Sequence, residues 1–281
     1  MKLKKIFALL SIPSLFFFTA CQKEEKEPDP EFETTFKLTE NQAVSEAIND
    51  DANVVFFEAA ANAHLMAGRL TEVFQTTNTL SCATVSITPQ NSFPKTIVID
   101  FGNGCTSIDG VSRAGKINIV LSDSVHHTGA TAVMTFTNYS TVGYKVEGTI
   151  TWTNTSTLNG VSWTRQITNG RVIEPLGGYY WTHEGTKNVT QTAGANTPLN
   201  LLDDVYSVTG SHTVTNPAGK TRTVTILEAL EKKTTCHNVS KGKMKIQAQT
   251  HFAVLDYGDG TCDNVAVITI DGVLPITITL P

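Results

Sequence analysis

The sequence predicts a mainly β protein: an antiparallel β-sandwich or barrel-like domain with an N-terminal helical segment. Two observations predict the β domain. After Cys82, Thr, Val, Ile and aromatic residues dominate and alternate with polar residues, as in half-buried strands. Turn dipeptides such as Asn159-Gly160 and Asn169-Gly170 separate several of these runs. No helical pattern lies between them, which excludes parallel βαβ units.

Residues 1–20 have the parts of a secretory signal peptide. Lys2, Lys4 and Lys5 precede an apolar stretch from Ile6 to Thr19, which is too short to span a bilayer as a helix. A small residue, Ala20, then stands directly before a cysteine. We therefore predict that the segment is removed and that Cys21 becomes the N-terminus. The alternatives are an uncleaved helix and an ordinary signal peptide.

The motif Thr19-Ala20-Cys21 resembles the signal of bacterial lipoproteins, whose cysteine is diacylated on sulfur and acylated on its amine. Phe18 departs from the leucine that usually begins this motif. The resemblance implies lipidation of Cys21, and two or more acyl chains hold a protein stably in a membrane. The following Gln22-Lys23-Glu24-Glu25 is similar to the signal that directs Bacteroidota lipoproteins to the outer face of the outer membrane.

We predict that residues 21–35 are the lipidated cysteine and an acidic tether. Residues 22–33 contain six acidic residues, two lysines and two prolines, a composition that cannot form a buried core. Residues 36–80 read as a helical segment. Thr39-Glu40-Asn41-Gln42 has the form of a capping box, and an apolar stripe follows it, interrupted by Asp51. A second helix or a continuation begins at Phe56. We predict that this segment covers the β core, and the alternative is an arm that binds a partner.

Residues 81–281 contain an internal duplication. The segments Cys82–Cys105 and Cys236–Cys262 both begin Cys-x-x-Val-Ser and end with Asp-aromatic-Gly-Asx-Gly before the closing cysteine. The four cysteines of an exported chain are expected to form two disulfides. The repetition predicts pairing within each copy, and we predict one continuous domain.

The tandem motifs IDFGNGC (residues 99–105) and LDYGDGTCDN (residues 255–264) resemble an uncharacterised β-rich family of Bacteroidota surface-exposed outer-membrane lipoproteins. The resemblance covers most of the β region and implies a location but no activity. The formal net charge is −5, and it is −8 without the three N-terminal lysines (−5 − 3). An acidic chain argues against nucleic acid as a partner.

Two groups of residues are candidates for ligand binding. Carboxylate and amide oxygens of the two Asp-aromatic-Gly loops suit calcium, although tight turns explain the same residues and are the preferred interpretation. Aromatic residues on a strand surface can stack on sugar rings. No other cofactor is expected. The metal candidates are Asp100, Asn103, Asp256 and Asp259, and the aromatic candidates are Tyr179, Tyr180 and Trp181.

No catalytic residue is predicted. The sequence has neither a Gly-x-Ser-x-Gly elbow nor a His-Glu-x-x-His pair. The leading hypothesis is a cell-surface lipoprotein that acts as a non-catalytic binding or structural module for a glycan or a host protein. The alternatives are an accessory subunit of an envelope complex and a carbohydrate-active hydrolase. The carboxylates considered for hydrolysis are Asp203, Asp204, Glu147, Glu174 and Glu184.

Overall fold

The structure, a computed structural model, describes residues 29–66, 75–197 and 199–281. It is mainly β, with one long helix, α1 (Pro30–Asn62), ahead of the strands. The strands are β1 (Thr84–Thr88), β2 (Lys95–Asp100), β3 (Cys105–Thr106), β4 (Ser112–Leu121), β5 (Thr131–Thr141), β6 (Tyr144–Asn154), β7 (Ser162–Ile173), β8 (Tyr180–Ala193), β9 (Val205–Thr215), β10 (Thr221–Lys233), β11 (Lys241–Gln247), β12 (Phe252–Asp259), β13 (Val265–Ile270) and β14 (Val273–Thr279). The signal peptide, Cys21 and most of the predicted tether lie outside the described residues.

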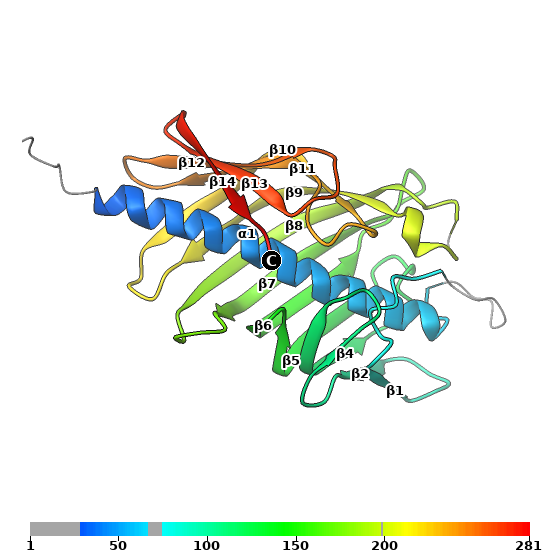
Figure 1. Cartoon of the computed structure of the whole chain (residues 1–281). Coiled ribbons are helices and arrows are strands. Elements are labelled where there is room, and N and C mark those ends of the chain that lie inside the picture. The colour runs from blue at the N-terminus through cyan, green and yellow to red at the C-terminus, as the bar shows by residue number, and fades with distance from the viewer. Residues whose placement is uncertain (1–28, 67–74, 198) are drawn as a thin grey trace, which may run out of the picture.

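All of these strands belong to one antiparallel sheet. Its order is β1-β2-β4-β5 and then each strand in turn to β14, while the short β3 pairs with β4. The ends of the path do not pair, so the sheet stays open. It curves so that β1–β2 and β12–β14 lie on either side of α1 (Figure 1). The predicted fold class, mainly β and antiparallel with an N-terminal helix, is confirmed, and its strands form a single open sheet.

The helix begins earlier than the sequence pattern predicts. Asp29 caps it by accepting a hydrogen bond from the Glu31 backbone N–H, and Pro30 occupies its first turn. The predicted tether therefore becomes helical at Pro30. Thr39, the predicted N-cap, is buried inside the helix and donates its hydroxyl hydrogen to the Thr35 carbonyl oxygen at 2.7 Å. The helix then continues through Phe56 to Asn62 without a break.

The Asn169-Gly170 dipeptide is not a turn, which corrects the sequence prediction. It lies inside β7, where the pairing register with β8 shifts between Ile167 and Gly170. Asn169 has a φ of 51°, and a Cβ on Gly170 would lie 2.6 Å from the His183 carbonyl oxygen. The residues that favour a hairpin turn here form a β-bulge instead. Asn159-Gly160 does lie between β6 and β7, as predicted.

The sheet encloses α1, although half of the helix's buried residues are polar. No residue between Leu38 and Ala61 is exposed. Ten of the twenty buried residues of α1 are polar or charged. Each buried polar group needs a hydrogen-bond partner, because water cannot reach it. No helix in the described part of the chain is long and apolar enough to cross a membrane.

Side chains on the inner face of the sheet supply several of those partners. Trp152 Nε1 donates to Asn53 Oδ1 at 3.0 Å, and Trp181 Nε1 donates to Ser45 Oγ at 2.7 Å. The rings of these tryptophans are buried in the core at the same time. The sheet therefore contributes both the apolar contacts and the polar groups that bury α1.

A buried ion network fixes the middle of α1. Arg165 on β7 donates from Nη1 to Asp50 Oδ1 at 2.6 Å and from Nη2 to Glu46 Oε2 at 3.3 Å. Lys187 on β8 donates to Glu46 Oε1. Burial alone would raise the pKa of Glu46, but Lys187 and Arg165 lower it to about 2. All four side chains have less than a tenth of their surface exposed.

Two buried histidines lie beside this network. His183 Nε2 is 3.0 Å from Asn49 Nδ2, and His212 Nε2 is 4.0 Å from Glu46 Oε1. Burial lowers the pKa of both histidines, and that of His183 falls to about 4. The cation Lys187 opposes their protonation as well. Both rings are therefore neutral near pH 7.

Replacing Glu46 by Gln should destabilise the protein strongly. The change leaves Lys187 and Arg165 buried with only one carboxylate, Asp50, against two cations. We expect the free energy of unfolding in urea to fall by about 3–5 kcal/mol. The matched control is Glu228→Gln, because Glu228 is 56% exposed and pairs with Lys243 on the surface, so its loss should stay below about 1 kcal/mol. Equal losses in the two variants would contradict the role of the network.

Stability should decline as the pH falls from about 6.5 toward 4. Below pH 6.5 the unfolded chain protonates its histidines, whereas folded His183 stays neutral down to about pH 4. The free energy of unfolding is therefore highest above pH 6.5. Below that pH, each such histidine lowers it by up to about 1.4 kcal/mol per pH unit. Urea unfolding between pH 7 and 5 measures this slope. His183→Gln should flatten it, and His127→Gln, at a 65% exposed ring, should not.

Candidate functional site

A hollow of about 610 Å³ opens at one rim of the sheet, above the middle of α1. We call it the rim cleft. Loops from the first half of the sheet form one wall, and loops from the second half form the other. Its floor is part of α1, and Pro281 also contacts it. The lining residues are Ala47, Ile48, Asp51, Asp109, Gly110, Val111, Thr141, Val142, Thr235, Cys236, His237, Asn238, Cys262, Asp263, Asn264 and Pro281.

A second hollow of about 240 Å³ continues the rim cleft along α1. The two share Asp51, Asp109 and residues 235–237 as lining, so they form one groove. The second hollow adds Thr79, Arg113 and Lys232 to its walls. A ligand in this groove would therefore contact both charged and amide side chains.

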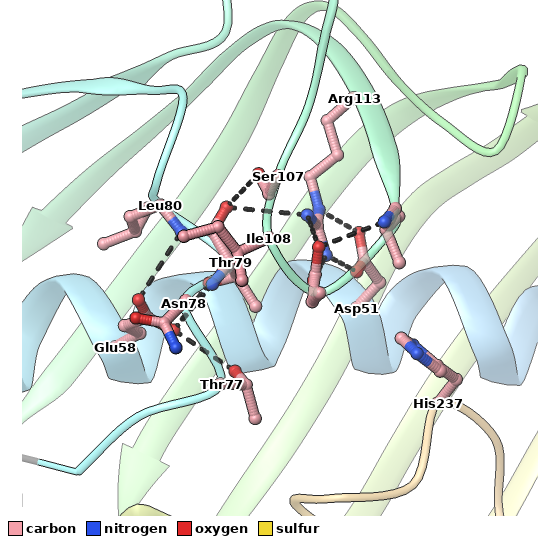
Figure 2. A network of polar contacts seen from close by, with 12 residues as sticks. Asp51, Glu58, Thr77, Asn78, Thr79, Leu80, Ser107, Ile108, Arg113 and His237 are labelled. Carbon is pink, nitrogen blue, oxygen red and sulfur yellow. Dashed lines mark hydrogen bonds and ion pairs between the residues drawn. The ribbon is translucent and has the colours of Figure 1, made fainter.

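Arg113 joins the helix to the first wall of the cleft (Figure 2). Its Nε donates to Asp51 Oδ2 at 3.0 Å, and its Nη2 donates to Asp51 Oδ1 and to Asp109 Oδ2, the latter at 2.7 Å. Its Nη1 donates to Asp109 Oδ1 at 3.3 Å. Tyr139 OH adds a bond to Asp51 Oδ2 at 3.0 Å. Burial would lower the pKa of Arg113, but the two carboxylates raise it, so the guanidinium is permanently charged.

Further hydrogen bonds hold the segment behind this wall. Thr79 donates its backbone N–H and its hydroxyl hydrogen to Glu58 Oε2 at 3.0 and 2.9 Å. Its carbonyl oxygen accepts from Ser107 Oγ at 2.6 Å. Figure 2 shows Glu58, Thr79 and Ser107 together beside α1. The first wall is therefore tied to the helix at both Asp51 and Glu58.

A disulfide supports each wall, in the pairing that the duplication predicts. Cys82 is bonded to Cys105, which lies opposite Arg113 in the β3–β4 ladder. Cys236 is bonded to Cys262 within the second wall. Buried Lys232 donates to the carbonyl oxygens of Cys236 and His237, and burial lowers its pKa. The cleft therefore has two cross-linked walls.

Asn238 carries an acceptor that the protein leaves unused. Its side chain is almost fully buried, and Nδ2 donates to the Pro281 carbonyl oxygen at 3.4 Å. Its Oδ1 has no hydrogen-bond partner among the described residues. Buried acceptors without a partner are rare in native proteins.

Neither candidate calcium loop lines the rim cleft. The first is a turn after β2: Asp100 Oδ1 accepts from the Gly102 N–H at 2.8 Å, and Lys116 pairs with its other oxygen at 2.7 Å. The second lies inside β12 at a register shift with β11, which corrects the interpretation as a turn; Asp256 Oδ1 accepts from the Gly258 N–H at 2.9 Å, and Lys243 is 3.6 Å from Oδ2. Asn103 and Asp259 are exposed. The described residues contain no group of three or more His, Cys, Asp or Glu side chains that could hold a metal ion.

The aromatic candidates separate into core and surface. Trp181 is completely buried against α1, so it is not available to stack on a ligand, which corrects that expectation. Tyr179 accepts a hydrogen bond from Asn41 Nδ2 at 3.3 Å. The Tyr180 ring lies 4.0 Å from the Arg171 guanidinium carbon and remains partly exposed. Of the three, the tyrosines alone retain accessible surface.

The candidate carboxylates do not converge. Glu147 pairs with Lys145 and Arg171, and Glu174 pairs with Lys37. Glu184 accepts from the Asn169 N–H, and Asp203 from the Thr197 hydroxyl. Burial raises the pKa of Asp204 to about 6, although Tyr206 and Gln191 donate to it.

The three acids that line the cleft, Asp51, Asp109 and Asp263, were not among the candidates predicted from the sequence. Asp51 had one sequence signal, a charge within an otherwise apolar helical stripe. No family model, curated protein or solved structure matches the chain. The site is therefore interpreted from its own chemistry.

Proposed function

We propose that the chain is a lipoprotein of the outer membrane, displayed at the cell surface, and that it binds a glycan in the rim cleft without catalysing a reaction. The observation that carries the binding role is the preformed cleft with cross-linked walls. Its volume, about 610 Å³, falls in the range of small-molecule sites. Rigid walls reduce the entropy that a ligand loses on binding.

The lining favours a neutral, hydroxyl-rich ligand. Exposed Asp263 and Asn264 offer acceptors to sugar hydroxyl groups. The two carboxylates of Asp51 and Asp109 exceed the single positive charge of Arg113, and Asp263 adds another negative charge. Nucleic acids and other polyanions would be repelled from such a cleft.

Hydrolysis is the second candidate, because Asp51 and Asp109 do face the same groove. Glycoside hydrolysis needs two carboxyl groups free to act on the substrate, one as acid and one as base or nucleophile. Here one guanidinium binds all four carboxylate oxygens, and Tyr139 binds one of them again. The oxygens are thus engaged within the protein, which favours binding over catalysis.

The segment between Cys21 and α1 is short enough to keep the domain close to a lipid anchor. Its eight chain steps from Cys21 to Asp29 (29 − 21) can reach at most about 28 Å. An anchor at Cys21 would hold the domain within that distance of the membrane. A ligand bound there would belong to the cell surface or its immediate surroundings.

Cys21→Ser should abolish lipidation and release the protein from the membrane fraction. Acylation requires the cysteine sulfur, so metabolic labelling with an alkyne fatty acid should mark the wild-type chain and not the variant. Gln22→Ala is the matched control and should remain labelled. Protease accessibility on intact cells tests surface display. Labelled Cys21→Ser protein would contradict the anchor.

A glycan screen tests the cleft, using a secreted form of the chain with Cys21→Ser, in calcium and in EDTA. We expect a calcium-independent hit. Asn264→Ala should weaken it by about 1 kcal/mol, the usual contribution of a hydrogen bond. Asn196→Ala, at an exposed turn residue, is the control. Calcium dependence would instead implicate the Asp100 and Asp256 loops.

Loss of binding in Tyr180→Ala alone would move the site to the start of β8. Release of sugar from a hit glycan, abolished by Asp51→Asn, would replace the binding role with hydrolysis. A screen without any hit would overturn the glycan proposal and leave a protein ligand or a structural role.

A further inference from the structure

The internal duplication recurs in the structure as two matching pairs of strands. β1 pairs with β2 over five consecutive residues, beginning with Thr84 opposite Asp100. β11 pairs with β12 over five consecutive residues in the same way, beginning with Lys243 opposite Asp256. Asp100 and Asp256 occupy the same position in the two repeated motifs. β1 is therefore the structural counterpart of β11.

β11 is covered on its other side by β10, and this strand completes its burial. Ile226 lies directly opposite Met244, and Val224 lies opposite Ile246. Val224, Met244 and Ile246 have no exposed surface. The apolar inner face of the sheet therefore continues from β12 through β11 to β10.

The matching positions of β1 are left uncovered, because β1 is an edge of the sheet (Figure 1). These positions are Val85 and Ile87, which lie opposite the fully buried Ile99 and Ile97 of β2. Val85 is 40% exposed, and Ile87 is half-buried. The first copy of the duplication thus presents an apolar edge at the place where the second copy has a neighbouring strand.

Edge strands of soluble proteins usually carry a feature that opposes pairing with another chain. β14, the other edge, has Pro275, which lacks a backbone N–H, and a register shift between Thr269 and Ile270 of its neighbour. β1 contains no proline, and its five pairs with β2 are uninterrupted. Residues 75–94, which include β1, contain no charged residue. No charge in this segment therefore opposes the approach of a second copy.

We propose that two copies of the chain associate through β1, paired antiparallel about a two-fold axis at Ser86. Val85 of one copy then lies opposite Ile87 of the other, and both stay on the inner face because alternate residues of a strand share a face. Each β1 supplies to the other the apolar neighbours that Val224 and Ile226 supply to β11. The sheet of one copy thus extends into the sheet of the other. This association is independent of the rim cleft.

Sedimentation of the secreted Cys21→Ser chain tests the association. Five residue pairs make a smaller contact than the interfaces of about 1,200 Å² or more that hold stable complexes. We therefore expect a reversible dimer that forms between about 1 μM and about 1 mM. Val85→Lys should weaken the dimer by about tenfold or more, because it places an ammonium group against Ile87 of the other copy.

Val120→Lys is the matched control. Val120 is 49% exposed on β4, two strands in from the edge, so this variant should dimerise like the wild-type chain. Both substitutions are at exposed positions, so both chains should keep the wild-type circular dichroism spectrum. A monomer at every concentration, or equal weakening by the two substitutions, would overturn the proposal.

Cysteine cross-linking tests the position of the two-fold axis. In the secreted chain, Ser86→Cys adds a single free thiol, because the other four cysteines form the two disulfides. The axis places residue 86 opposite itself, with the two Cα atoms about 4.5–5.5 Å apart, a separation that a disulfide spans. Mild oxidation should therefore yield a covalent dimer.

Thr277→Cys is the control for this experiment, because Thr277 is an exposed residue of the other edge strand, β14. It should remain monomeric under the same oxidation. Failure of Ser86→Cys to cross-link, or cross-linking of Thr277→Cys to the same extent, would overturn the proposed pairing through β1.

Discussion

The ion network of Glu46, Asp50, Arg165 and Lys187 is the constraint on which the rest of the structure depends. No residue of α1 between Leu38 and Ala61 is exposed and half of its buried residues are polar, so its apolar residues alone do not fix its rotation, and each buried polar group must meet a partner. A rotation of α1 would separate Glu46 from both cations and leave buried charges unpaired, at a cost of several kcal/mol. The network therefore determines which helix residues face each strand, including Asp51 beside the first cleft wall.

The open cleft follows from the position of this helix. Because α1 occupies the inside of the sheet, β1 and β14 remain apart, and loops from the two halves approach each other over the helix instead. Such loops would be mobile without cross-links. Cys236–Cys262 lies within the second wall, and Cys82–Cys105 ties the stem of the β3–β4 hairpin whose tip belongs to the first wall.

Local patterns predicted much of the fold, while the site depended on contacts between distant residues. Alternation after Cys82 predicted a domain of antiparallel strands, and repetition predicted both disulfides. Propensity failed at Asn169-Gly170, where neighbouring strands impose a bulge, and at Trp181, whose polar edge meets the helix instead of solvent. The cleft combines Asp51, Asp109 and Asn238. Their sequence neighbours contain no common motif, so only the folded chain brings them together.

The enclosed polar helix also bears on how the chain folds. A protein is made from its N-terminus, so α1 exists long before the strands that surround it. Its partners extend from Arg113 on β4 to β13, and β13 ends 208 residues after α1 ends (270 − 62). An apolar helix left waiting that long would invite aggregation. The threonines, asparagines and carboxylates of α1 keep it compatible with water until the sheet is complete. The last strands then convert a solvated helix into the centre of the core.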